Sequence, residues 1–202
     1  MSIWFFVWLC MTLIILYFVG WNIVILIRQK SAWKTFAKKH KLRYKGGKFG
    51  ESPEMSGSFN GSTISLFTGE HEAETSRGTR KLMAIEIILP SKPEFEAGLA
   101  TGGMVDLLKD MNFGQELKIK HKGWSKEGIA ASPEPEKFET YLIKERLDAL
   151  MTLARIKNSW VTLIFRDETA LLRFDTPDAL DTVTKLESIL DKMTKTAKAL
   201  GY

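Results

Sequence analysis

The sequence predicts an α+β protein, in which an N-terminal single transmembrane helix is followed by an antiparallel-sheet domain covered by two or three helices. Three observations lead to this prediction. Residues 3–27 form an apolar run without a charged side chain. Later segments show the alternation and tight turns of β-hairpins, and the end of the chain has apolar residues at helical spacing. We therefore divide the chain into a transmembrane anchor at 1–28, a basic juxtamembrane helix and glycine loop at 29–50, and a soluble α+β domain at 51–202.

The apolar run has the length of a membrane span. At about 1.5 Å rise per residue it makes a helix of roughly 37 Å, against a hydrocarbon core of about 30 Å. A cleaved signal peptide would need a basic region before the run, a shorter apolar stretch and a small-residue cleavage site, and the sequence has none of these. We predict an uncleaved anchor; a buried helix of a soluble protein is the remaining alternative.

Aromatic side chains lie toward both ends of this run, where their rings favour the boundary between membrane and water. They are Trp4, Trp8, Tyr17 and Trp21. Asn22 is the only strongly polar side chain within the run. Two interpretations of Asn22 stay open: it lies at the interface, or it contacts a partner by a hydrogen bond to another transmembrane helix.

The segment from 28 to 50 contains nine Lys and Arg residues and no Asp or Glu. By the positive-inside rule, this asymmetry predicts a protein of the inner or plasma membrane, with a short N-terminus outside and the domain on the cytoplasmic or matrix side. Because the net charge of the chain is +5, the rest carries a net charge of −4, which argues against nucleic acid as a partner. The basic residues expected to meet membrane lipid are Arg28, Lys30, Lys34, Lys38, Lys39 and Lys41.

From Ser31 to Lys41, the apolar residues Trp33 and Phe36 fall at helical spacing among lysines, which predicts a basic amphipathic helix. Its apolar face either lies in the membrane interface or docks on the soluble domain. We favour docking, because the face is only about three turns long. The pair Gly46-Gly47 is expected to end this helix and open a loop that runs to Pro53.

Alternation of apolar and polar residues marks the predicted strands. The clearest signal is Asn60-Gly61 between two alternating runs, because both residues tolerate positive φ in a hairpin turn. A second hairpin turns at Asp167-Glu168, and the polar segment from Gly69 to Gly78 is expected to be a solvated loop. The predicted strands are 55–59, 63–67, 81–89, 117–121, 160–166 and 169–174.

A flexible glycine-containing stretch, Gly98 to Gly103, is expected to lead into a short amphipathic helix. Its residues Met104, Leu108 and Met111 are expected to be exposed and to contact a partner. This segment is therefore a candidate surface for protein binding.

Two longer helices are predicted in the second half of the domain. Apolar spacing indicates helix from Glu134 to Arg155 and allows a break near Ile143. Thr176 is expected to cap the last helix, with Pro177 at its first position. The apolar residues of this last helix indicate either a coiled-coil seam or, as we favour because they span only about two and a half heptads, packing on the sheet. They are Val183, Leu186, Leu190, Met193, Ala197 and Leu200.

The sequence carries no recognisable catalytic signature. His71 stands among Glu70, Glu72 and Glu74, but in a loop such alternating side chains point apart, so we interpret them as solvated and not as metal ligands. Cys10 lies inside the apolar run, so no intrachain disulfide is available. The glycine-rich segments match no phosphate-binding motif, and no GxSxG elbow is present. We therefore predict no enzyme, no cofactor, no metal and no small-molecule substrate.

Three classes of function are compatible with this pattern. The first is a single-pass accessory or assembly subunit, whose cytoplasmic-side domain binds other proteins of a membrane complex. The second is a domain that senses anionic lipid or a small ligand at the membrane surface, and the third is an enzyme without a known motif. An anchor, an ordered domain and the absence of a catalytic motif favour the first. The expected partners are membrane lipid and other membrane-protein subunits.

Overall fold

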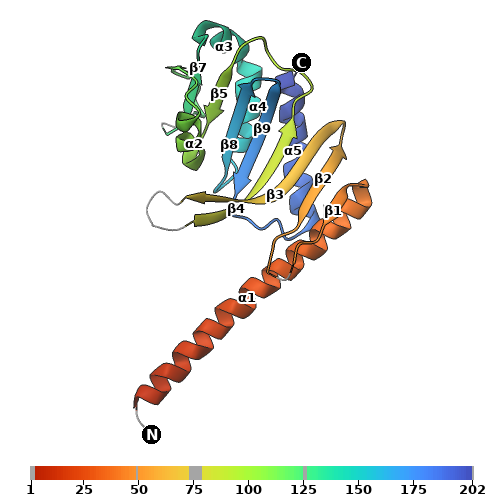
Figure 1. The fold of residues 1–202 in the computed structure, drawn as a ribbon, viewed down its shortest axis with the longest axis vertical. Helices are drawn as coiled ribbons and strands as arrows, with labels where there is room; N and C mark the ends of the chain where they lie inside the picture. Colours follow the sequence, from red (N-terminus) through yellow and green to blue (C-terminus); the bar gives the residue numbers. More distant parts are fainter. Residues whose placement is uncertain (1–2, 49, 73–78, 125–126, 202) are drawn as a thin grey trace.

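The computed structural model describes residues 3–48, 50–72, 79–124 and 127–201, and it confirms the predicted α+β class. Figure 1 shows a sheet with helices packed against it and one long helix that projects away from the domain. The described strands form one antiparallel sheet of nine strands in the order β1-β2-β3-β4-β9-β8-β5-β7-β6. The strands are β1 (Arg43–Lys45), β2 (Glu54–Phe59), β3 (Ser62–Glu72), β4 (Thr79–Ile88), β5 (Ala97–Ala100), β6 (Gln115–Glu116), β7 (Ile129–Ser132), β8 (Trp160–Arg166) and β9 (Thr169–Thr176). The helices are α1 (Ile3–His40), the 3₁₀ helix η1 (Gly102–Met104), α2 (Val105–Asp110), α3 (Pro135–Tyr141), α4 (Lys144–Ala154) and α5 (Val183–Gly201).

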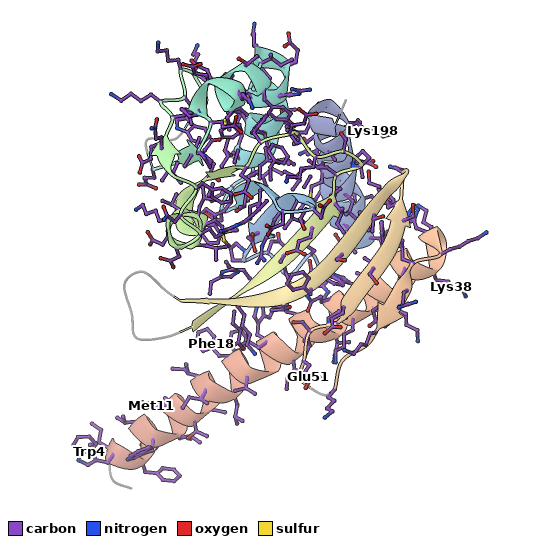
Figure 2. All side chains as sticks on the ribbon, turned by 45° about the horizontal axis from the view of Figure 1, so that its top comes forward. Trp4, Met11, Phe18, Lys38, Glu51 and Lys198 are labelled. Carbon is purple, nitrogen blue, oxygen red and sulfur yellow. The ribbon has the colours of Figure 1, made fainter. Side chains whose placement is uncertain are left out.

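Helix α1 joins the apolar run and the basic segment into one continuous element. It is long and apolar enough to cross a membrane, and its first part extends away from the domain with side chains such as Trp4, Met11 and Phe18 projecting freely (Figure 2). Farther along, one face of α1 is buried, and Trp33 and Phe36 are completely enclosed. The expectation that this face docks on the domain is therefore confirmed.

The docked part of α1 contributes two large side chains to the main core. The Phe36 ring lies 5.5 Å from the Phe59 ring and 4.4 Å from the His40 ring, measured between centroids. The indole N–H of Trp33 donates a hydrogen bond of 3.2 Å to the carbonyl of Leu180. Burying each large apolar side chain contributes about 1.5–3 kcal/mol, so this contact holds the helix firmly on the sheet.

Helix α1 ends before the glycine pair, and the expectation that Gly46-Gly47 ends it is wrong. Lys41 takes a left-handed conformation with φ of 55°, and the N–H of Leu42 bonds the carbonyl of Ala37 at 2.9 Å. This is the geometry of a helix C-cap, adopted here by lysine instead of glycine. Strand β1 follows at once and pairs with β2, so the basic segment is built into the domain.

Both predicted hairpins are present. Asn60 and Gly61 have φ values of 50° and 84°, as a tight turn between β2 and β3 requires. Strands β8 and β9 meet at Asp167, whose φ is 48°. The loop expected from Gly69 is wrong over its first four residues, because β3 continues to Glu72 in register with β4. The part of that expected loop at 73–78 lies outside the described residues.

Three short strands, β1, β5 and β7, are absent from the sequence prediction. Most residues of β5 and β7 are small, and β5 is buried on both faces, so neither of these two strands shows an alternating pattern. Gly98, expected to be flexible, lies inside β5. A Cβ atom at Gly98 would stand 2.4 Å from Leu108 and 2.8 Å from Phe113, so glycine lets η1 and α2 approach the sheet. The strand expected at 117–121 is also wrong, because β6 is confined to Gln115–Glu116.

The remaining helices agree with the sequence except at one boundary. The predicted helix from 134 to 155 breaks at Ile143 into α3 and α4. Helix α5 packs on the sheet beside α1 and α4, as favoured. It begins at Val183 and not at Pro177, because β9 extends through Thr176. Thr182 is its cap: the side-chain oxygen accepts a 3.3 Å hydrogen bond from the N–H of Lys185.

The helices divide unequally between the two faces of the sheet. The docked part of α1, together with α4 and α5, covers the face that carries the main core. On the other face, η1 and α2 pack over β5 and β8 and close a smaller core. That face is left without a helix over β2, β3, β4 and β9 within the described part of the chain.

We expect Phe36→Ala to lower the free energy of unfolding by about 3–5 kcal/mol, because it empties a completely buried site that joins α1 to the sheet. Thermal unfolding of the full chain in mild detergent, followed by tryptophan fluorescence, measures this change. The matched control is Phe18→Ala on the exposed part of α1. Equal unfolding midpoints for the two variants would contradict the docking of α1 on the core.

We expect Gly98→Ala to destabilise the domain by about 1–3 kcal/mol, since the added methyl group meets Leu108 and Phe113 at less than 3 Å. Gly103→Ala is the control, because its Cβ meets Trp160 only at 3.4 Å and beyond. The same unfolding measurement compares the two. If Gly98→Ala is no less stable than Gly103→Ala, the close packing of α2 on β5 is refuted.

Candidate functional site

The uncovered part of the sheet presents a connected row of side chains. The strand register aligns Ser56, Ser65, Glu86 and Arg173 across β2, β3, β4 and β9. Apolar side chains accompany this row, and Ile88 is 55% exposed. We call this surface the open face, and it consists of Ser56, Ser65, Phe67, Glu86, Ile88, Leu171 and Arg173.

The centre of the open face is a charged network around Arg173. Its guanidinium donates to both carboxylate oxygens of the fully buried Asp175, at 2.8–3.1 Å, and to Glu86 at 3.1 Å. A further contact of 3.1 Å joins Arg173 Nη2 to His71 Nε2, and the guanidinium lies 5.6 Å from the centre of the Phe67 ring. A buried carboxylate requires such pairing, so Arg173 fixes Asp175 within the sheet.

The positive charge of Arg173 is fully paired within the network, so the network does not present a free cation. The Arg173 donors are directed at Asp175, Glu86 and His71, and the Nε2 atom of His71 accepts one of them, which places its proton on Nδ1 when the ring is neutral. Burial raises the pKa of the Glu86 carboxyl; Arg173 opposes this rise and the Asp175 charge adds to it. This arrangement is suited to shaping a binding surface and not to activating a nucleophile.

His71 does not lie in a solvated loop as expected. It is part of β3, and its Nε2 atom lies 3.5 Å from Asp175. Within the described residues, no group of three or more His, Cys, Asp or Glu side chains converges as metal ligands do. Alternation did not reveal this network, because its members come from three strands that only the sheet brings together.

A recess borders the network at the edge of the open face. It has a volume of about 540 Å³ and is lined by side chains of β1 to β4, including Arg43, Glu54, Ser65, Phe67 and Glu86. The outer strand β1 is only three residues long, and Lys45 and Glu54 form a 2.9 Å ion pair across it. Short, charged edge strands resist pairing with another chain, so a partner would meet the face of this sheet and not its edge.

The residues expected at a membrane boundary all lie on α1 or directly after it. Trp4, Trp8, Tyr17 and Trp21 are exposed. Asn22 is also exposed, and its Nδ2 atom donates 2.8 Å to the carbonyl of Phe18 on the same helix. The amide is therefore satisfied within α1, and the structure does not test whether it also contacts another helix.

The basic residues differ in their surroundings. Arg28, Lys34, Lys38 and Lys41 are exposed, Lys30 donates 2.7 Å to the carbonyl of Lys48, and Lys39 forms a 2.6 Å ion pair with Glu187. The ion pair with Lys39 lowers the pKa of the Glu187 carboxyl. Because α1 is continuous through His40, these side chains are spread along one rigid axis.

The expected exposure of Met104 and Leu108 is wrong. Both are buried in the smaller core beneath η1 and α2, together with Phe113. Met111 is half-buried, and its carbonyl accepts 3.0 Å from Arg166. Helix α2 packs closely on β5 because Gly98 has no side chain, and its apolar residues therefore point toward the sheet.

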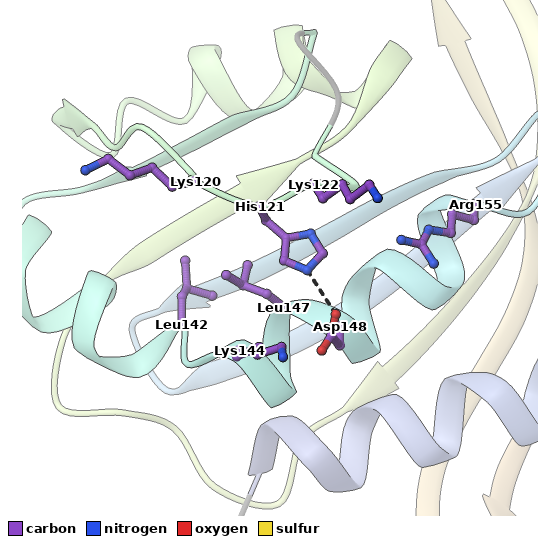
Figure 3. A pocket seen from close by; sticks show the side chains of 8 residues that line it. All are labelled: Lys120, His121, Lys122, Leu142, Lys144, Leu147, Asp148 and Arg155. Carbon is purple, nitrogen blue, oxygen red and sulfur yellow. Dashed lines mark hydrogen bonds and ion pairs between the residues drawn. The ribbon is translucent and has the colours of Figure 1, made fainter.

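A pocket of about 610 Å³ lies between α4 and the segment before β7 (Figure 3). His121 lies at its centre, with Nε2 2.9 Å from Asp148 and Nδ1 accepting 3.1 Å from the N–H of Gly123. Both ring nitrogens thus have a hydrogen-bond partner, and the imidazole links the segment before β7 to α4. The basic side chains of the lining are Lys120, Lys122, Lys144 and Arg155.

A groove of about 490 Å³ lies where α1 meets the domain. One wall is apolar and comes from α1, with Val19, Ile23 and Leu26 among its residues. The other wall comes from the domain and includes Lys81 and Met83 of β4. We call this space the α1 groove. Sequence analysis did not predict it, since its walls are 21 to 160 residues apart along the chain.

Among family models, curated proteins and solved structures, none matches this chain. The fold and the surfaces described above are therefore the basis for a functional proposal.

We expect the pH dependence of stability to reveal the environment of Glu86. A carboxyl whose pKa is raised on folding stabilises the fold at low pH, and this contribution is lost as the pH rises from 4.5, its ordinary pKa, through the raised value. The stability of the native chain relative to Glu86→Gln should therefore fall over that window and stay level above it. Denaturant titrations between pH 3.5 and 7 measure the difference. A difference that grows with pH would show instead that pairing with Arg173 outweighs burial.

Proposed function

We propose that this chain is a single-pass membrane-anchored accessory or assembly subunit, whose domain binds another protein of the same membrane complex. The observation that carries the proposal is the continuity of α1 from its exposed apolar part into the core of the domain. A flexible linker would let the domain move freely. A continuous helix gives it one orientation, which favours a stable complex with a neighbouring membrane protein.

The proposed orientation follows from the distribution of charge. Nine Lys and Arg residues follow the apolar run within the distance over which the positive-inside rule operates. The domain is therefore proposed to lie on the cytoplasmic or matrix side of an inner or plasma membrane. The aromatic residues Trp4 and Trp21 would then lie toward the two ends of the span.

The geometry of α1 weighs against lipid sensing by the basic segment as a whole. If the membrane ends near Ile27, Lys34, Lys38 and Lys41 stand roughly 10, 17 and 21 Å farther along the helix axis. Attraction to an anionic membrane falls off within about 8–10 Å at physiological ionic strength. Arg28 is therefore better placed to meet lipid headgroups than the lysines that follow it.

The open face is the proposed docking surface. Helices cover the opposite side of the sheet, and the outer strands are short and charged, so the open face is the largest part of the sheet left for a partner. The open face combines polar side chains with the exposed Ile88, as do interfaces between proteins that assemble after folding. The internally paired Arg173 gives this surface a fixed shape before binding.

We expect a photo-crosslinking amino acid at Ser65, in the native membrane, to capture one protein partner. The same label at Lys195, on the exposed side of α5 across the sheet, is the matched control. Crosslinked products are identified by mass spectrometry of detergent extracts. If Ser65 gives only lipid adducts, or the same protein as Lys195, the open face is not the docking surface.

A substitution tests the same surface without a label. We expect Ser65→Arg to reduce co-purification of that partner at least tenfold, because a large cation is inserted beside Glu86 and Arg173 at the centre of the interface. Thr152→Arg on the exposed side of α4 should leave co-purification unchanged. Equal retention of the partner by both variants would count against the proposal.

A further inference from the structure

The α1 groove has a composition that differs between its two walls. On one side, Val19, Ile23 and Leu26 of α1 present aliphatic side chains. On the other, Ser52 and Lys81 of the domain present a hydroxyl and an ammonium group. A ligand that fills the groove would therefore carry an apolar part along the helix and a polar, negatively charged part against the domain.

Gln29 provides a buried polar group inside the groove. Its side chain lines the space although it is only 3% exposed, and its Nε2 atom donates to the sulfur of Met83 at 3.0 Å. A thioether is a weak acceptor, so this amide is incompletely satisfied in a buried setting. An oxygen of a bound ligand would be a stronger acceptor for the same amide.

Lys81 is available at the mouth of the groove. Its Nζ atom lies 3.6 Å from Glu70, but the side chains are 69% and 61% exposed, and such surface pairs contribute little. Glu70 therefore reduces the positive charge of the site but leaves the Lys81 ammonium group able to bind a ligand.

The position of the groove along α1 identifies the class of ligand. If the membrane ends near Ile27, where the apolar run ends, the part of α1 that lines the groove, from Val19 to Gln29, crosses this boundary. Val19 would then lie at the depth of the acyl chains, and Gln29 and Lys81 at the depth of the headgroups. This step rests on the anchoring part of the proposed function.

We propose that the α1 groove binds one anionic phospholipid. The acyl chain lies along Val19, Ile23 and Leu26, and the phosphate is held by the Lys81 ammonium and the Gln29 amide. The lipid occupies the α1 groove between the span and the domain. It is therefore a specifically bound lipid and not part of the annular lipid around the span.

Native mass spectrometry of the full chain, purified in mild detergent, tests this proposal. We expect one molecule of phosphatidylglycerol to bind saturably and at least fivefold more tightly than phosphatidylcholine with the same acyl chains. Lys81→Ala should abolish this preference. Lys198→Ala, which removes an exposed lysine at the far end of α5, should keep it. Glycerol phosphate, which has the phosphate but no acyl chain, should not compete.

Several outcomes would overturn the proposal. Equal binding of the two lipids would mean that only annular lipid is present. Equal loss in both lysine variants would mean that net charge, and not the groove, attracts the lipid, and full competition by glycerol phosphate would mean a phosphate site without an acyl subsite. Gln29→Leu gives a second measurement: with an unchanged melting temperature, it should weaken phosphatidylglycerol binding at least threefold, and unchanged binding would contradict the role of the amide.

Failure of this proposal is distinguishable from failure of the proposed function. Loss of the lipid preference leaves the crosslinks from Ser65 unaffected, since the open face lies on the other side of β3 and β4. Release of the protein from membranes by alkaline carbonate would instead refute the anchoring on which both proposals depend.

Discussion

The burial of Trp33 and Phe36 is the constraint on which the rest of the structure depends. These two side chains turn the last part of α1 into a piece of the domain core. Because the helix continues without interruption into its exposed apolar part, the direction of that part is fixed by the same contact. A domain joined to the apolar part of α1 by a flexible loop could take many orientations relative to it. In this protein, the packing of the Trp33 and Phe36 rings against the sheet fixes that orientation.

The placement of α1 also explains why one sheet face remains open. With α1, α4 and α5 on the same side, the main core is complete, and the other face needs cover only where apolar residues gather. The helices η1 and α2 supply that cover over β5 and β8, and Gly98 permits their close approach. Over β4 and β9 the face is occupied by Glu86 and Arg173, which satisfy one another and tolerate solvent.

The sequence was most informative where a pattern was local. The apolar run and the Asn60-Gly61 turn follow from neighbouring residues and were predicted, and the same local pattern allowed the break at Ile143. The failures have a common cause in long-range packing. Strand β5 and the burial of Met104 depend on a fit between segments that only the folded sheet brings together, and the Arg173 network joins three strands. The start of α5 was misplaced because the signal at Thr176 and Pro177 is strong locally, while pairing of β9 with β4 and β8 overrides it.

The two proposed binding surfaces share one hairpin. Strands β3 and β4 present Ser65 and Glu86 to the open face, while Thr68 and Met83 of the same strands line the α1 groove on the opposite side. Met83 in turn accepts hydrogen bonds from Gln29 on α1 and Thr68 on β3. An antiparallel pair is too thin for its faces to move independently, since alternate residues of one backbone serve both. The packing of α1 on β4 therefore sets the orientation of the open face relative to the apolar part of α1.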